Sequence, residues 1–267
     1  MNILKKTLAP ITDEGWKELT EQMRKLLNTH LTGREFVDID GPNGLDFGGI
    51  ATGRLITPDK NKKDGVNFGI REYLPLTEVR KPFELDLWEL DDVERGAKDV
   101  DLEPLEEAVK QIALFEENAI YKGFKEGQIR GLEESAEHST IMIPDDPNDF
   151  LNIISAQVVS LQKDGVKGPY SLVITNDMWQ KLVTLSKGYP VIKHLEDILG
   201  GQVIVNNFNE NSYLVSEQGE DYELILGQDI SIGYDGHTTE KVKLYLTESF
   251  TFRVLSPEAV RILGKKK

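Results

Sequence analysis

Residues 43–67, NGLDFGGIATGRLITPDKNKKDGVN, decide how this chain is built. The stretch is rich in glycine, and strand-like pieces flank a polar tip at residues 59–65, which follows Pro58. The pattern predicts a long β-hairpin that projects from the rest of the protein. A lone hairpin buries little apolar surface and is marginally stable in water. We therefore expect something outside the hairpin's own fold to hold it.

Two long amphipathic helices flank this hairpin in the sequence. The first is predicted from about Thr12 to Leu31, where apolar residues recur at steps of three and four and Gly33 follows as a stop. The second is predicted from about Leu102 to Phe124, with acidic residues in its first turns, where the helix dipole favours them. It is the longest predicted helix, and we expect it to be the structural spine.

The second half of the chain mixes helices and strands. Helices are predicted over residues 148–161, after Asn176 and from Pro190, and strands over residues 170–175, 202–205, 212–216 and 222–226. Residues 230–255 are rich in strand, and a short terminal helix is predicted from Pro257. The fold class is therefore α+β, with one inserted hairpin and one inserted α/β unit.

Composition and charge exclude several classes of protein. The 267 residues are 39% hydrophobic and 29% charged, which is typical of a soluble globular protein with a real core. The formal charge of −15 argues against a nucleic-acid partner, because binding phosphates needs a basic face. The absence of cysteine excludes disulfides, thiol catalysis and cysteine zinc sites. With no secretory signal and no apolar run of the ~20 residues that a membrane span needs, we expect a cytoplasmic protein without a membrane partner.

No arrangement of residues indicates catalysis or metal binding. None of the four histidines lies within metal-ligand spacing of another. The glycine-rich stretch lacks the phosphate-binding patterns, and there is no G-x-S-x-G nucleophile elbow. Carboxylate pairs arise readily among 46 acidic residues and usually mark solvated faces. We therefore predict no catalytic residue, no metal site and no enzyme activity.

One aromatic residue is a candidate for ligand contact. If Phe83, Leu85 and Leu87 line the buried face of a strand, Trp88 lies on the opposite, more exposed face. An exposed tryptophan near an arginine such as Arg80 can stack a planar ligand or take part in a subunit interface. On the residues alone, the interface or packing role is favoured.

Three stretches, read together, resemble a known family. They are GREFVDIDGP at 33–42, FELDLWEL at 83–90 with ERG at 94–96, and LILGQDISIGY at 224–234. LAP at 8–10, GPY at 168–170 and TESFTF at 247–252 accompany them. In order and spacing, over nearly the whole chain, these motifs are similar to those of the linocin/encapsulin shell proteins, closest to the small-shell type of family 1.

The resemblance implies a Hong Kong 97-type phage capsid fold. Its parts would be an amino-terminal helix with the start of a peripheral domain (1–42), an E-loop hairpin (43–75), the peripheral domain with its spine helix (76–130), an axial domain (131–223) and the completion of the peripheral domain (224–267). About sixty copies would close into an icosahedral shell through heterologous contacts. Pairing of the E-loop with a neighbouring copy would explain why it needs no core of its own.

The resemblance also implies a partner inside the shell, a cargo protein whose carboxy-terminal targeting peptide binds the inner wall. The matching positions for binding this peptide are Leu27, Leu31, Arg34, Phe36, Asp38, Ile230, Ile232 and Tyr234. They would form an apolar groove in which the arginine and the aspartate fix the register of an extended peptide. The expected cargo is a ferritin-like iron-storage protein or, second, a dye-decolorising peroxidase. The family's pore loop at the fivefold axis corresponds to Ser186, Lys187, Gly188, Tyr189 and Pro190.

Some similar members bind a flavin on the outer surface. Their tryptophan and arginine match Trp88 and Arg80, whereas the intervening Lys81-Pro82 departs from their pattern. FMN or riboflavin would be the ligand, and the shell itself requires no cofactor.

Two alternatives to the encapsulin interpretation remain at this point. The first is a phage-type major capsid protein, against which we set the short chain that begins directly at the amphipathic helix. The second, weaker alternative is a flavin-binding redox shell.

Overall fold

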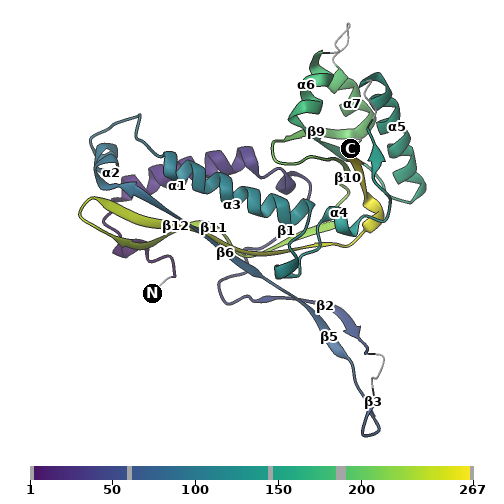
Figure 1. Cartoon of the computed structure of the whole chain (residues 1–267), viewed down its shortest axis with the longest axis horizontal. Coiled ribbons are helices and arrows are strands. Elements are labelled where there is room, and N and C mark those ends of the chain that lie inside the picture. The colour runs from purple at the N-terminus through teal and green to yellow at the C-terminus, as the bar shows by residue number, and fades with distance from the viewer. Residues whose placement is uncertain (1–2, 59–61, 144–146, 185–190, 265–267) are drawn as a thin grey trace.

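The computed structural model describes residues 3–58, 62–143, 147–184 and 191–264. Two long helices, α1 (Asp13–His30) and α3 (Glu103–Tyr121), lie side by side over a four-stranded sheet (Figure 1). Thr12 caps α1, because its hydroxyl accepts a hydrogen bond from the N–H of Gly15 at 3.1 Å. Both helices pack their apolar side chains into the core between helices and sheet, so both predicted helices are confirmed.

The four-stranded sheet has the order β1-β11-β12-β6. Its strands are β1 (Asp38–Asp40), β6 (Thr77–Asp86), β11 (Tyr222–His237) and β12 (Lys241–Val254). β1 runs parallel to β11, and the other two pairs are antiparallel. Along β6, buried Phe83 and Leu85 alternate with exposed residues, as expected of a strand with one face in the core.

Residues 43–75 form the projecting hairpin, which we call the arm (Figure 1). Its strands are β2 (Gly49–Ile56) paired with β5 (Ile70–Pro75), and β3 (Lys62–Lys63) paired with β4 (Val66–Asn67). Within the described part of the chain, no arm residue belongs to either hydrophobic core. Its exposed apolar side chains are Leu45, Leu55, Ile56, Val66, Phe68, Ile70 and Tyr73. The predicted hairpin is confirmed, although residues 59–61 of its tip lie outside the described residues.

A second unit, at the upper right of Figure 1, is built on a five-stranded sheet of order β7-β13-β10-β8-β9. Its strands are β7 (Ile141–Met142), β8 (Tyr170–Thr175), β9 (Gly200–Asn206), β10 (Ser212–Ser216) and β13 (Val260–Gly264). Its helices are α5 (Pro147–Lys163), α6 (Asn176–Thr184) and α7 (Val191–Leu199), while the one-turn α4 (Leu132–Ser135) follows α3. Every residue of β8 is buried, which is typical of a central strand covered on both faces.

The strand prediction around Trp88 needs correction. β6 ends at Asp86, and a short helix, α2 (Leu87–Glu94), begins there because the Asp86 carboxylate accepts a hydrogen bond from the N–H of Trp88 at 2.8 Å. Leu87 therefore does not continue the buried face of a strand. The side chain of Trp88 is 71% exposed, as predicted, but it lies in the first turn of a helix.

The predictions for the end of the chain also need correction. A single 3₁₀ turn (Pro257–Ala259) replaces the predicted terminal helix. The strand that follows, β13, pairs with β10, and all of its residues are buried. The boundary drawn at 224–267 is therefore wrong at its end, because β13 completes the sheet of the second unit and not the four-stranded sheet. The predicted pore loop, Ser186–Pro190, lies outside the described residues.

A buried polar cluster connects the two units. The Glu117 carboxylate on α3 accepts hydrogen bonds from the N–H of Gly33 (2.8 Å), the hydroxyl of Thr32 (2.5 Å) and the side-chain amide of Asn206 (2.6 Å). Tyr121 places its hydroxyl 3.1 Å from that of Thr32. Burial raises the pKa of Glu117 to about 8, although the three hydrogen bonds act to lower it. One carboxyl group thus joins the end of α1, the spine helix and the last residue of β9.

Candidate functional site: a groove between α1 and β11

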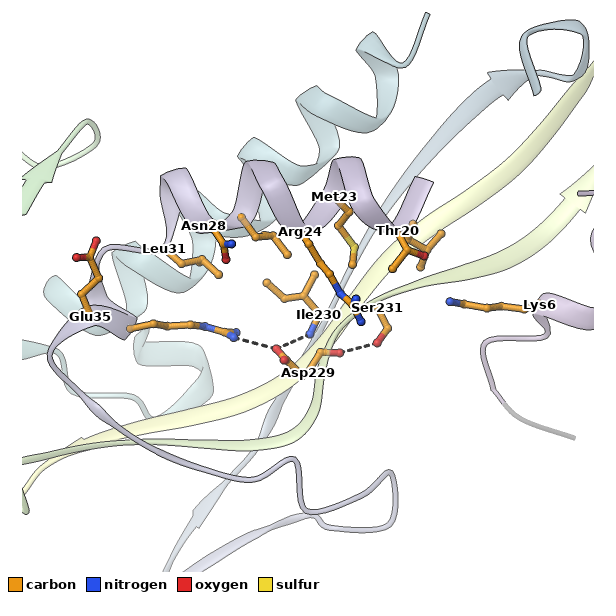
Figure 2. Close-up of a pocket in the computed structure, with 13 residues that line it drawn as sticks. Lys6, Thr20, Met23, Arg24, Asn28, Leu31, Glu35, Asp229, Ile230 and Ser231 are labelled. Carbon is orange, nitrogen blue, oxygen red and sulfur yellow. Dashed lines mark hydrogen bonds and ion pairs between the residues drawn. The ribbon is translucent and has the colours of Figure 1, made fainter. Parts of the chain in front are cut away.

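A groove of about 630 Å³ lies between α1 and β11. Its lining residues are Lys6, Thr20, Met23, Arg24, Leu27, Asn28, Leu31, Arg34, Glu35, Asp229, Ile230, Ser231 and Ile232. Figure 2 shows Lys6 at one end, Glu35 at the other, and α1 along one side. The groove is large enough for a short peptide or a small molecule.

The helix contributes two rows of side chains to the groove. Met23, Leu27 and Leu31 recur every four residues and form the apolar row, whose other side packs in the core. Thr20, Arg24 and Asn28 form a second row with the same spacing on the neighbouring strip of the helix. The helix therefore gives the groove an apolar floor and a polar rim beside it.

The opposite wall is a distorted part of β11. The register between β11 and β12 shifts between Gln228 and Ser231, which marks a β-bulge. At the bulge, the Asp229 carboxylate accepts a hydrogen bond from the N–H of Ile230 at 2.8 Å. The side chains of Ile230 and Ile232 are buried under α1.

Arg34 lies in the wall of the groove but is fully engaged by other side chains. It donates two hydrogen bonds to Glu116, at 2.8 and 2.6 Å, one to Asp229 at 3.0 Å and one to Glu248 at 2.8 Å. The side chains of Glu116 and Glu248 are completely buried. Burial, and next the charge of Glu116, raises the pKa of Glu248 well above its usual value. Arg34 therefore neutralises buried acid groups, and a bound peptide would have to compete for it.

The Lys6 end of the groove carries positive charge. Lys6, in the 3₁₀ turn Lys6–Leu8, places its ammonium 5.1 Å from the centre of the Trp16 ring. Partial burial, and next the charge of Arg24, lowers the pKa of Lys6. Within the described residues, neither Lys6 nor Arg24 forms an ion pair. This end of the groove favours a negatively charged group.

Five of the eight residues predicted for peptide binding line the groove: Leu27, Leu31, Arg34, Ile230 and Ile232. The other three do not. Phe36 is buried between Tyr121 and Tyr222, with ring centres 6.0 and 5.8 Å away. Asp38 accepts a hydrogen bond from the N–H of Glu220 at 2.6 Å and lines a different cavity.

Tyr234 is the third of these residues. Its hydroxyl lies 2.5 Å from Nδ1 of His237, and its N–H donates to the carbonyl of Leu4 at 2.8 Å. Sequence reasoning had missed the polar row of Thr20, Arg24 and Asn28. Their four-residue spacing beside the apolar stripe is the signal that could have identified them.

Arg80 and Trp88, the residues predicted to hold a flavin, lie in two different elements, β6 and α2. Arg80 lies in β6, where its guanidinium covers the ring of Tyr245 at 4.3 Å and pairs with Glu78 at 3.2 Å. The six residues of extended strand from Arg80 to Asp86 span about 20 Å. Trp88 lies two residues further along the chain, in α2, and its ring is exposed.

Two features of the described residues bear on other functions. Residues 3–58, 62–143, 147–184 and 191–264 contain no group of three histidine, aspartate or glutamate side chains placed to hold a metal ion. Among the helices of the same ranges, none is both long and apolar enough to span a membrane.

Structural comparison identifies the fold. A virus-like particle from Pyrococcus furiosus matches 93% of this chain and 98% of its own, with a TM-score of 0.67 at 18% sequence identity. The capsid of the Myoviridae phage XM1 matches 88% of this chain and 92% of its own, with a TM-score of 0.58 at 11% identity. The predicted α+β fold of the Hong Kong 97 capsid type is confirmed.

Sequence comparison identifies the family. Residues 1–251 match the Linocin_M18 family, described as "Encapsulating protein for peroxidase". A type 1 encapsulin shell protein of Rhodococcus erythropolis is 40% identical over 97% of this chain and 98% of that protein. One from Mycobacterium tuberculosis is 36% identical over 97% of this chain and 98% of that protein. With this similarity running through the arm, the spine helix and the groove alike, the chain belongs to the encapsulin shell-protein family.

Proposed function

We propose that this chain assembles into a closed icosahedral shell of about sixty copies in the cytoplasm. The shell holds a cargo protein inside by binding the carboxy-terminal targeting peptide of the cargo in the groove between α1 and β11. The chain itself has no catalytic role. The family's description supports a peroxidase cargo, and a ferritin-like iron-storage protein is the other candidate.

The arm is the observation that carries the assembly proposal. Seven of its apolar side chains are exposed, and its described residues reach neither core. Exposed apolar side chains gathered on one projecting segment indicate an interaction site in a soluble protein. An arm laid across adjacent copies would bury it and would make each copy part of a large obligate interface.

Native mass and electron microscopy test the assembly proposal. Sixty copies of a 30.1 kDa chain have a mass of about 1.8 MDa. We expect a particle of this mass with a closed shell and without nucleic acid. A well-behaved 30.1 kDa species with no particles would contradict the proposal, and a genome-filled particle would favour the phage alternative.

A variant that fills the groove tests the cargo proposal. Asn28 is exposed and lines the groove, whereas Lys25 is exposed on the same helix and does not. We expect Asn28→Trp to abolish encapsulation of the native cargo and Lys25→Trp to leave it intact, with shell assembly unchanged in both variants. Equal cargo content in the two variants would exclude this groove as the binding site.

Flavin binding at Trp88 is a second, separate proposal. It is favoured by the exposed indole ring, which can stack on a planar ligand. Arg80 of the same copy already covers the Tyr245 ring and pairs with Glu78, so a cation beside the ligand would have to leave these contacts or come from another residue or another copy. Shells purified after riboflavin feeding should carry flavin absorbance that Trp88→Ala removes. Colourless wild-type shells would exclude the proposal.

A further inference from the structure

A second cavity, of about 370 Å³, lies where the arm joins the rest of the chain, which we call the body. The arm contributes residues of β2 and β5 to its lining, and the body contributes residues 128 and 130, one residue of α4 and the end of β12. The cavity shares no lining residue with the groove between α1 and β11. Its volume is that of a site for a small molecule.

The lining of this cavity is positively charged, although the chain as a whole is acidic. It contains Arg54, Arg130 and Arg253, with Glu72 as the one described carboxylate. Arg253 donates a hydrogen bond to Glu223 at 2.6 Å, so its charge is already paired. Arg54 and Arg130 form no ion pair with another described residue. Two guanidinium groups without a carboxylate partner favour an anionic ligand.

A β-bulge in the arm places Arg54 at the cavity. Residues 52–54 of β2 lie opposite a single residue of β5, Glu72. Gly53, in the middle of the bulge, has φ +78°, and the hydroxyl of Thr52 donates a hydrogen bond to the Glu72 carboxylate at 2.7 Å. Extra residues of this kind bend a strand and re-aim its side chains. The bulge therefore brings an arginine into the lining and engages the carboxylate in a hydrogen bond.

On the body side, the cavity is lined by a turn in an uncommon backbone conformation. Gln128 has φ +59°, in the left-handed region that few residues other than glycine adopt. Two backbone hydrogen bonds between Phe124 and Ile129, at 2.8 and 3.0 Å, close the turn. Arg130 follows and donates to the carbonyl of Glu134 at 3.2 Å, a contact that leaves its charge unpaired. Conformations of this kind cluster at ligand sites, where the surrounding fold holds them in place.

The cavity also offers apolar surface beside its arginines. The apolar lining residues are Leu74, Phe252, Val254 and Leu255. The side chain of Leu255 is 44% exposed, and Leu74 and Val254 are half-buried. An apolar lining with a few charged groups suits a ligand that has both an anionic head and an apolar part.

We propose that this cavity binds a small organic anion, in which a phosphate or carboxylate group is attached to an apolar body. The anionic group lies between Arg54 and Arg130, and the apolar part contacts Leu74 and Leu255. Since Arg54 belongs to the arm and Arg130 to the body, the bound ligand holds the two together.

Phenyl phosphate is a suitable probe, because it combines a phosphate group with an apolar ring. We expect the purified protein, in the assembly state that it adopts, to bind one molecule per chain in equilibrium dialysis. Binding should be at least about fivefold tighter than that of inorganic phosphate, because the ring buries apolar surface. Equal affinity for the two probes would overturn the apolar part of the site. A protein that binds neither probe, as when another copy fills the cavity, would overturn the proposal.

Matched double variants test the location of the site. We expect Arg54→Gln with Arg130→Gln to weaken phenyl phosphate binding about tenfold, because both charge-assisted hydrogen bonds are lost. The control, Arg71→Gln with Lys125→Gln, removes the same charge from the same arm and the same turn, but neither residue lines the cavity. All four side chains are exposed, so both variants should fold. Equal affinities of the two variants would overturn the assignment to Arg54 and Arg130.

Chemical modification of arginine gives a readout in the unmutated protein. Phenylglyoxal reacts with accessible guanidinium groups, and mass spectrometry locates the modified residues. With phenyl phosphate at about ten times its Kd, mass action predicts about tenfold slower modification of Arg54 and Arg130. Arg71, which is exposed and outside the cavity, should react at an unchanged rate. Protection of Arg71 to the same degree, or no protection of Arg54 and Arg130, would overturn the site.

Discussion

Arg34 donates four hydrogen bonds to three carboxylates, and two of these carboxylates are completely buried. A guanidinium in this position stabilises mainly by neutralising charge that the fold has already removed from water. Its proximity to the groove therefore does not make it a peptide ligand. Loss of cargo after charge reversal at Arg34 would be explained by damage to the groove wall.

Because Glu116 and Glu248 are buried, we expect removal of Arg34 to destabilise the fold strongly. We expect Arg34→Met to lower the free energy of unfolding by about 3 to 5 kcal/mol, because it leaves Glu116 and Glu248 without their cation. Arg34→Met with Glu116→Gln should recover part of this loss. Thermal unfolding and soluble yield would measure both effects, and an unchanged melting temperature in Arg34→Met would contradict the assignment.

The raised pKa of Glu117 predicts how the stability of the folded chain depends on pH. Its pKa is about 8 in the folded chain and about 4.5 when unfolded. At a pH between these two values, the folded state therefore binds more protons than the unfolded state does. Stability should therefore fall as pH rises from about 4.5 to 8, by at most about 1.4 kcal/mol per pH unit from this group.

Glu117→Gln should flatten this pH dependence, since glutamine does not titrate. Glu248, whose pKa is also raised, would account for a slope that persists. Glu107→Gln is the matched control, because Glu107 is exposed on the same helix. Melting temperatures measured from pH 5 to 8 would test this, and parallel curves for wild type and Glu117→Gln would refute it.

At the scale of elements, the geometry of the arm is fixed by contacts within the hairpin, but these contacts do not supply its stability. Gly49 begins β2 with φ +150°, and a Cβ there would collide with the carbonyl oxygen of Leu74. This close approach sets where the two strands meet. The exposed side chains farther out contribute no core contact within the chain.

The arm therefore offers a prediction about assembly. Ile56 and Ile70 face each other across β2 and β5 and are 52% and 58% exposed. We expect Ile56→Asp with Ile70→Asp to leave a folded chain but to prevent particle formation, because each isoleucine would otherwise contribute about 2 kcal/mol when buried between copies. Ile56→Val with Ile70→Val should still assemble. Native mass and circular dichroism would measure both, and normal particles of the aspartate variant would contradict the role of the arm.

At the scale of the whole molecule, the two units share one hydrophobic core and are also joined by buried polar contacts. Glu117, Thr32 and Asn206 connect them, while the arm projects away from both (Figure 1). A shell built from such a protomer needs each copy to keep its shape while its arm contacts a neighbour. Buried hydrogen-bonded clusters help to keep that shape, because breaking one would leave buried polar groups unpaired at a high cost in free energy.

The sequence by itself predicted the elements that depend on local pattern. The helical spacing of apolar residues predicted α1 and α3, the glycine-rich flanks and polar tip predicted the arm, and motif order predicted the capsid fold. The resemblance to the encapsulin motifs also identified five residues of the groove. Of these, Leu27 and Leu31 belong to the apolar stripe of the first helix, which is visible in the sequence. Periodicity reports which face of an element is buried, and the prediction of the two helices depends on nothing more.

Only the tertiary structure decided the features that depend on contacts between distant residues. It placed Phe36 in the core and returned the last strand to β10. It showed that Arg34 is held by carboxylates 82 to 214 residues away in sequence. Local propensity contains no information about these partners, because pairing across the fold is set by which buried charges and strand edges come together in space.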